Sequence, residues 1–138
     1  MNEFIKPEDY DAFCETQLKR NEKFLETFAE DIHDLSPKVQ RVHIGNVESF
    51  LNDYLVQRAA VPMQRGARLA SDYFGYFLPR KGMCSGEEIR SAAASVKKFY
   101  KSMVKHGLVE EKEYKYLCTQ IGEGIEEWIQ ERVYADPQ

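Results

Sequence analysis

Two segments of this chain combine an apolar strip with a strip of positive charge at helical spacing; they run from Ser36 to Leu55 and from Ser85 to Leu108. Successive residues of an α-helix are separated by about 100°, so the second segment sorts its side chains onto two sides. The apolar side holds Ile89, Val96, Phe99, Tyr100, Met103 and Val104, and the basic side holds Arg90, Lys97, Lys98, Lys101 and Lys105. This patterning predicts a helical domain with a basic surface.

The size and composition of the chain favour one globular domain. It has 138 residues, of which 43% are hydrophobic and 30% charged, and we expect residues 1–138 to form a single helical domain. No apolar run reaches the roughly 18 residues that a membrane span needs. The first residues also lack the charged and apolar regions of a secretory signal. We therefore expect a cytoplasmic protein with no membrane partner.

The net charge of −4 conceals an uneven distribution along the chain. Residues 1–35 carry 4 Lys or Arg against 10 Asp or Glu, residues 36–107 carry 12 against 5, and residues 108–138 carry 3 against 8. A basic centre therefore lies between two acidic ends. Such asymmetry says more about binding partners than the overall charge does.

The periodicity is helical throughout, and no segment alternates as a strand would, which predicts an all-α fold of about five helices. We expect the first helix to begin near Pro7 and to fray near Asp31 and Asp34, where acidic residues oppose the helix dipole. Its predicted apolar side is Tyr10, Phe13, Leu18, Phe24, Leu25, Phe28 and Ile32.

Ser36 and Pro37 predict the start of the second helix, because serine caps exposed amides and proline suits the first helical position. Its expected buried stripe is Val39, Val42, Val47, Phe50, Leu51, Tyr54 and Leu55, with Gly45 as a weak point. A third helix should contain Leu69, Tyr73, Phe74, Phe77 and Leu78 and end before Pro79.

Ser85 and Glu88 have the spacing of a capping box and predict the start of the fourth helix, which Gly107 should close in a left-handed conformation. The last helical pattern comprises Tyr114, Leu117, Cys118, Ile121, Ile125, Trp128, Ile129 and Val133. Gly122 and Gly124 leave open whether this pattern forms one helix or two.

No motif in the sequence predicts catalysis, a cofactor or a metal site. His33, His43 and His106 have no neighbour at the spacing of metal ligands. Cys14 and Cys118 fall near apolar helix faces, and Cys84 lies in a Gly/Ser loop where we consider it a candidate for exposure. Without an oriented base, nucleophile or metal, we expect a protein that is not an enzyme.

The three central helices resemble the N-terminal core-binding domain, a SAM-like fold, of tyrosine recombinases and phage integrases. The likeness lies in LSPKVQRVHIGNVESFLNDYL, ASDYFGYFLPRK and SGEEIRSAAASVKKFYKSMVKHGLV, and with the first helix it covers residues 10–108. Residues 109–138 would form an acidic helical extension. The resemblance implies a domain that clamps double-stranded DNA during recombination, with these contacts on the second and fourth helices: Lys38, Arg41, Arg90, Lys97, Lys98 and Lys101. Lys105, on the same basic side of the fourth helix, is a further candidate contact.

The resemblance also places DNA cleavage in a separate domain with a His-x-x-Arg pair. In this chain the residues three positions after the histidines are Ser36, Asn46 and Val109, so the DNA-binding function would be non-catalytic. Lysine and arginine would bind phosphates without reading the base sequence.

A protein-interaction module with no nucleic-acid role is the alternative interpretation. The acidic ends could cover the basic centre, mediate self-association or bind a basic partner protein. Aromatic stacking on single-stranded bases is a further use of such residues, but the phenylalanines have core spacing, and only Tyr76 and Tyr116 stay open as exposed aromatics.

Overall fold

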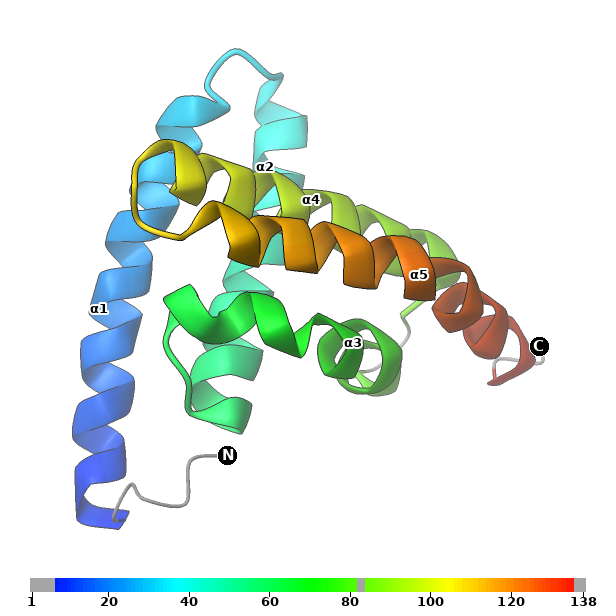
Figure 1. Cartoon of the computed structure of the whole chain (residues 1–138), viewed down its shortest axis with the longest axis horizontal. Coiled ribbons are helices and arrows are strands. Elements are labelled where there is room, and N and C mark those ends of the chain that lie inside the picture. Colours follow the sequence, from blue (N-terminus) through cyan, green and yellow to red (C-terminus); the bar gives the residue numbers. More distant parts are fainter. Residues whose placement is uncertain (1–6, 82–83, 136–138) are drawn as a thin grey trace.

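Helices form all the regular structure in the computed structural model, which describes residues 7–81 and 84–135 (Figure 1). No strand occurs in these two ranges, so the all-α prediction is confirmed. The helical segments are α1 (Pro7–Asp31), α2 (Pro37–Glu48), η1 (Ser49–Ala59), η2 (Met63–Leu69), α3 (Ala70–Asp72), η3 (Tyr73–Phe77), η4 (Leu78–Arg80), α4 (Gly86–Lys105) and α5 (Glu111–Ala135).

Local capping residues set the start of α2 and both ends of α4 as the sequence predicts. The Ser36 hydroxyl accepts a hydrogen bond from the Val39 amide at 3.2 Å, with Pro37 as the first helical residue. Ser85 and Glu88 form the reciprocal capping box at the start of α4. Gly107 follows α4 with a φ of 72°, a left-handed conformation that glycine adopts without a steric penalty.

The core lies between the long helices and is rich in aromatic rings. Its largest fully buried side chains are Tyr54, Tyr73, Tyr100, Phe28, Phe50, Phe74, Phe99, Ile32, Leu51, Leu55, Met63 and Ile89. Phe28 of α1 meets Phe99 of α4 edge to face, with ring centroids 5.4 Å apart. The interpretation of the phenylalanines as core residues is thus confirmed, with Phe24 and Phe77 partly buried at its margin.

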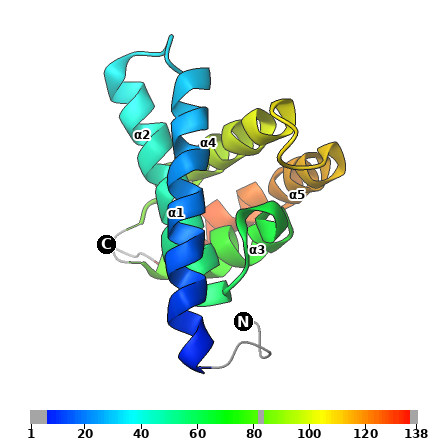
Figure 2. The same ribbon diagram turned by 90° about the vertical axis from the view of Figure 1, so that its left-hand side faces the viewer.

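Two residues of the expected stripe on the second helix are exposed, contrary to the prediction. Val39 and Val42 keep 41% and 45% of their surface, whereas Val47 is fully buried. Val42 lies five residues before Val47, about 140° away around an α-helix, so both cannot face the same core. α2 buries the side that carries Ile44 and Val47, and α1 runs alongside it (Figure 2). Leu18 of α1, also expected to be buried, is exposed.

The third helical region continues through Pro79, where we expected it to end. Its geometry changes to a short 3-10 turn, η4, that begins at Leu78 and has proline near its start. The Lys81 amide closes this turn on the Leu78 carbonyl at 3.0 Å. Proline is tolerated there because the first amides of a new turn have no intrahelical partner.

α5 is one continuous helix, which settles the open question at Gly122 and Gly124. A Cβ on Gly124 would lie 2.3 Å from the Trp128 ring, and one on Gly75 of η3 would lie 2.8 Å from the indole nitrogen. Trp128 also stacks on Phe74, with centroids 5.7 Å apart. Gly124 therefore provides space for the tryptophan ring and does not break the helix.

Candidate nucleic-acid interface

α4 presents the basic side chains of the predicted interface on its outer side. Ile89, Val96, Phe99, Tyr100 and Met103 on the opposite side are fully buried. Arg90, Lys98, Lys101 and Lys105 are exposed, and Lys97 is partly exposed. These five positions span about 100° of the helix circumference at 100° per residue. The fold therefore turns the five basic side chains of α4 toward solvent as one strip, which we call the α4 basic strip.

Carboxylates pair with the two ends of the α4 basic strip. Arg90 lies 3.2 Å from Glu126 of α5, and Lys105 lies 3.3 Å from Asp31 of α1. Among the described residues, no carboxylate forms an ion pair with Lys97, Lys98 or Lys101. The middle of the strip thus keeps three uncompensated positive charges.

A hollow lies beside the middle of the strip, where α4 meets the end of α1. Its volume is about 380 Å³, and it is lined by Phe28, Asp31, Ile32, Lys98, Lys101, Ser102 and Lys105. The two apolar residues belong to the buried core, so they form its floor, while the lysines stand at its edge. Lys98 and Lys101 have no ion-pair partner among the described residues at this edge, whereas the Asp31 carboxylate in the same lining is paired with Lys105.

The two predicted contacts on α2 lie apart from these pairings. Lys38 and Arg41 are exposed in the first turns of α2, and no described residue bonds to either side chain. α2 joins α4 farther along, where Asn46 donates to the Ser91 and Ser95 hydroxyls at 3.1 and 3.0 Å. Lys38 and Arg41 are therefore available for binding, but no hydrogen bond joins them to the α4 basic strip.

His43 also lies in this region, although its sequence pattern did not mark it as a DNA contact. Its Nδ1 lies 2.8 Å from the Ser95 hydroxyl of α4. Burial lowers the pKa of His43, and the nearby charge of Lys98 lowers it further. Asn46 lies one helical turn after His43, and this spacing of two polar residues could have predicted a polar contact between α2 and α4. Ser95 is fully buried, so the His43–Ser95 pair offers no nucleophile to a substrate.

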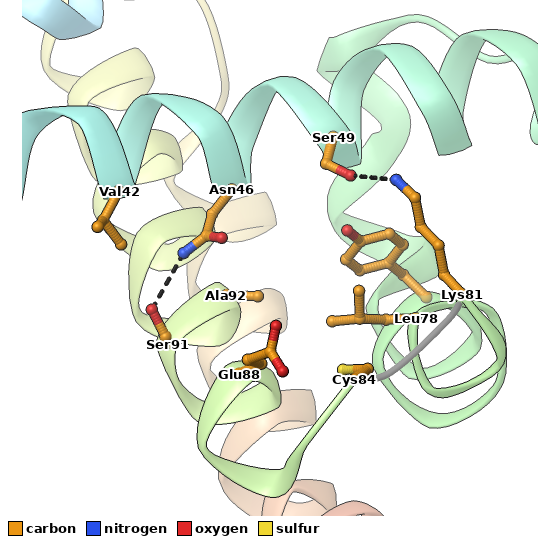
Figure 3. A pocket seen from close by; sticks show the side chains of 10 residues that line it. Val42, Asn46, Ser49, Leu78, Lys81, Cys84, Glu88, Ser91 and Ala92 are labelled. Carbon is orange, nitrogen blue, oxygen red and sulfur yellow. Dashed lines mark hydrogen bonds between the residues drawn. The ribbon is translucent and has the colours of Figure 1, made fainter.

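A second cavity, of about 520 Å³, opens between α2, the η3–η4 segment and the start of α4 (Figure 3). Several of its polar groups already have hydrogen-bond partners in the protein. Lys81 reaches Ser49 at 2.7 Å and Asp53 at 2.6 Å, and Glu88 caps α4. Cys84, which we considered a candidate for exposure, is buried in this wall, because its side chain belongs to the hydrophobic core.

The two tyrosines left open as exposed aromatics are covered by arginines. The Arg80 guanidinium lies 3.8 Å from the centre of the Tyr76 ring, and that of Arg68 lies 4.1 Å from the Tyr116 ring. Arg68 also forms two hydrogen bonds of 3.0 Å to Glu113, and these lower the pKa of that carboxyl. One face of each ring is thus occupied.

No cluster of His, Cys, Asp and Glu in residues 7–81 and 84–135 could hold a metal ion. No helix in these ranges is both long and apolar enough to cross a membrane. Comparisons with protein-family models, with curated proteins and with solved structures found no match. The resemblance to recombinase core-binding domains stays a prediction.

Proposed function

We propose that this protein is a non-catalytic module that binds the phosphate backbone of double-stranded DNA in the cytoplasm. The observation that carries the proposal is the middle of the α4 basic strip, where Lys97, Lys98 and Lys101 face solvent without a carboxylate partner. Lys38 and Arg41 of α2 would extend the contact. The resemblance to recombinase core-binding domains supports the same use of these two helices.

Backbone binding of this kind depends on salt because each neutralised phosphate releases counterions. On B-DNA the slope of log K against log salt is about −0.9 per phosphate. The three uncompensated lysines therefore predict a slope near −3, with weak binding that is best measured at about 50 mM salt. The DNA sequence should have little influence, because phosphate contacts carry no direct base information.

The test is a salt-titrated binding assay on labelled duplex with a matched pair of variants. Lys97→Glu with Lys101→Glu should abolish binding. Lys112→Glu with Lys115→Glu makes the same change of charge on α5, at lysines that already lie 3.6 and 3.8 Å from Glu110 and Glu111. We expect this control to bind almost as well as the parent. Equal loss in both variants, or no binding by the parent, would overturn the proposal.

A groove between α1 and α2 favours the second candidate, a protein-interaction module. It measures about 460 Å³ and is lined by Leu18, Glu22, Leu25, Glu26, Ala29, Ile44, Glu48 and Asn52. Apolar walls with three glutamates suit a basic amphipathic helix, from a partner or from a second copy. Glu22→Lys with Glu26→Lys should then abolish self-association measured by light scattering, while leaving duplex binding intact.

A further inference from the structure

His43 lies at the junction of α2 and α4, where one arrangement of hydrogens makes all three hydrogen bonds around the Ser95 hydroxyl at once. The Ser95 hydroxyl donates its one proton to the Ser91 carbonyl at 3.1 Å. Its lone pairs then accept from Asn46 Nδ2 at 3.0 Å and from His43 Nδ1 at 2.8 Å. Nδ1 of His43 therefore carries a hydrogen, and Nε2 is the nitrogen that gains or loses a proton.

The Nε2 atom of His43 reaches solvent. The Nε2 atom has no hydrogen-bond partner in the described part of the chain. In that part, Asn21 Oδ1 is the side-chain nitrogen or oxygen atom that is both fully buried and without a partner, so Nε2 is not fully buried. The charged group that acts on the ring is Lys98 of α4. The ring is thus fixed on its Ser95 side and open on the other, beside a lysine of the α4 basic strip.

The surroundings of His43 keep it neutral at pH 7 in the unbound protein. Burial disfavours the imidazolium, and the Lys98 ammonium repels it, so the pKa of His43 lies below its usual value of 6.5. A bound anion opposes these two effects: a phosphate offsets the positive charge of Lys98 and offers an acceptor to an Nε2–H group. The protonated ring needs no rearrangement, because Nδ1–H donates to Ser95 in either state.

We propose that His43 is a phosphate contact of the DNA interface and that its Nε2 takes up one proton from solvent as the duplex binds. This inference rests on the proposed DNA-binding function. The proton returns to solvent when the duplex dissociates, and the phosphodiester stays anionic throughout.

The inference predicts the direction in which duplex affinity changes with pH. Between the pKa of His43 in the free protein and its higher pKa in the complex, binding takes up a proton, so affinity rises as the pH falls. The limit for one proton is about tenfold per pH unit. Below the free pKa the ring is already charged, and this contribution to the pH dependence ends.

The experiment measures duplex affinity by fluorescence anisotropy from about pH 5.5 to 8 at fixed ionic strength. The parent is compared with His43→Gln and with His33→Gln, which replaces a histidine in the turn after α1 whose Nδ1 contacts the Glu30 carbonyl. We expect a pH dependence in the parent and in His33→Gln that is largely absent in His43→Gln. Thermal unfolding checks that both variants are folded.

Proton NMR of the parent chain supplies a readout that needs no substitution. The His43 ring signals are titrated with and without duplex, and we expect the midpoint to move to higher pH in the complex. An unchanged midpoint, or an equal pH dependence in His43→Gln and the parent, overturns the role of His43 while DNA binding stands. Absence of duplex binding by the parent overturns the proposed function and this inference together.

Discussion

The Asp31 carboxylate, at the last residue of α1, accepts a hydrogen bond of 2.5 Å from the Ser102 hydroxyl of α4. Lys105 and His106 approach the same carboxylate at 3.3 and 2.9 Å. We expected the end of α1 to fray because acidic residues oppose the helix dipole there. Instead, side chains of α4 donate hydrogen bonds to the Asp31 carboxylate at this helix end. The pKa of Asp31 is lowered, and the largest cause is the hydrogen bond from Ser102.

Acid should therefore weaken the attachment of α1 to α4. Because the pKa of Asp31 is lower in the folded state, its stabilising effect is present above the unfolded pKa near 3.8 and is lost as the pH falls further. Asp31→Asn should cost about 1 kcal/mol at pH 7, the scale of a charge-assisted hydrogen bond that becomes neutral. Urea unfolding at pH 7 and at about pH 3 measures this, with a smaller difference expected in acid. The exposed Asp34→Asn is the control, and an equal loss there would contradict the assignment.

Removing the carboxylate that pairs with Arg90 should strengthen duplex binding. Glu126→Gln leaves Arg90 without its 3.2 Å partner and adds one unpaired charge to the α4 basic strip. We expect an affinity about two- to threefold higher at low salt and a steeper salt dependence. Glu123→Gln changes the charge of α5 by the same amount at another exposed position. If both variants gain equally, the effect is one of net charge, and the Arg90–Glu126 pair does not restrain binding.

Gly45 offers a site for stabilisation within α2. A Cβ built there meets nothing within 4 Å, so alanine fits without displacing a neighbour. Gly45→Ala should raise the free energy of unfolding by about 1 kcal/mol, because glycine is the more flexible residue in the unfolded chain and the poorer helix former. Chemical denaturation measures the change, and a loss of stability would show that α2 needs glycine at this position.

The same substitution at Gly66 should have the opposite effect. A Cβ there would lie 2.3 Å from Leu55 Cδ1 and 2.6 Å from the Tyr100 hydroxyl. Tyr100 is fully buried and donates to the Met63 carbonyl at 2.7 Å, so it cannot withdraw without losing that bond. Gly66→Ala should cost about 1 to 3 kcal/mol, the range for overpacking a core. A neutral result in the same denaturation assay would mean that η2 moves aside.

Local chemistry explains which parts of the fold were predictable. Ser36, the Ser85–Glu88 pair and Gly107 act within one turn of themselves, so their side-chain types are sufficient to mark helix ends. The side that a helix buries depends on its neighbours. Val39 and Val42 belong to an apolar pattern, but α1 and α4 cover other sides of α2. Likewise, the space that Gly124 leaves for Trp128 exists only once α5 lies over η3.

The candidate site divides in the same way. Helical spacing alone placed the five basic residues of α4 on one strip. The pairing of Lys105 with Asp31 joins positions 74 residues apart, and no local sequence pattern predicts it. The same holds for His43 and Ser95, which are 52 residues apart. Charge neutralisation and ring orientation are tertiary properties, so the sequence could identify candidate contacts but not which of them keep their charge unpaired.

The packing of Trp128 gives this protein an intrinsic fluorescent probe. It is the one tryptophan of the chain, and its ring is confined by Gly75, Gly124 and Phe74. Its emission should therefore shift to the red if the half of α5 that carries Trp128 separates from η3. Unlabelled protein would suffice to time that detachment by stopped flow and to decide whether it accompanies capture of a polyanion.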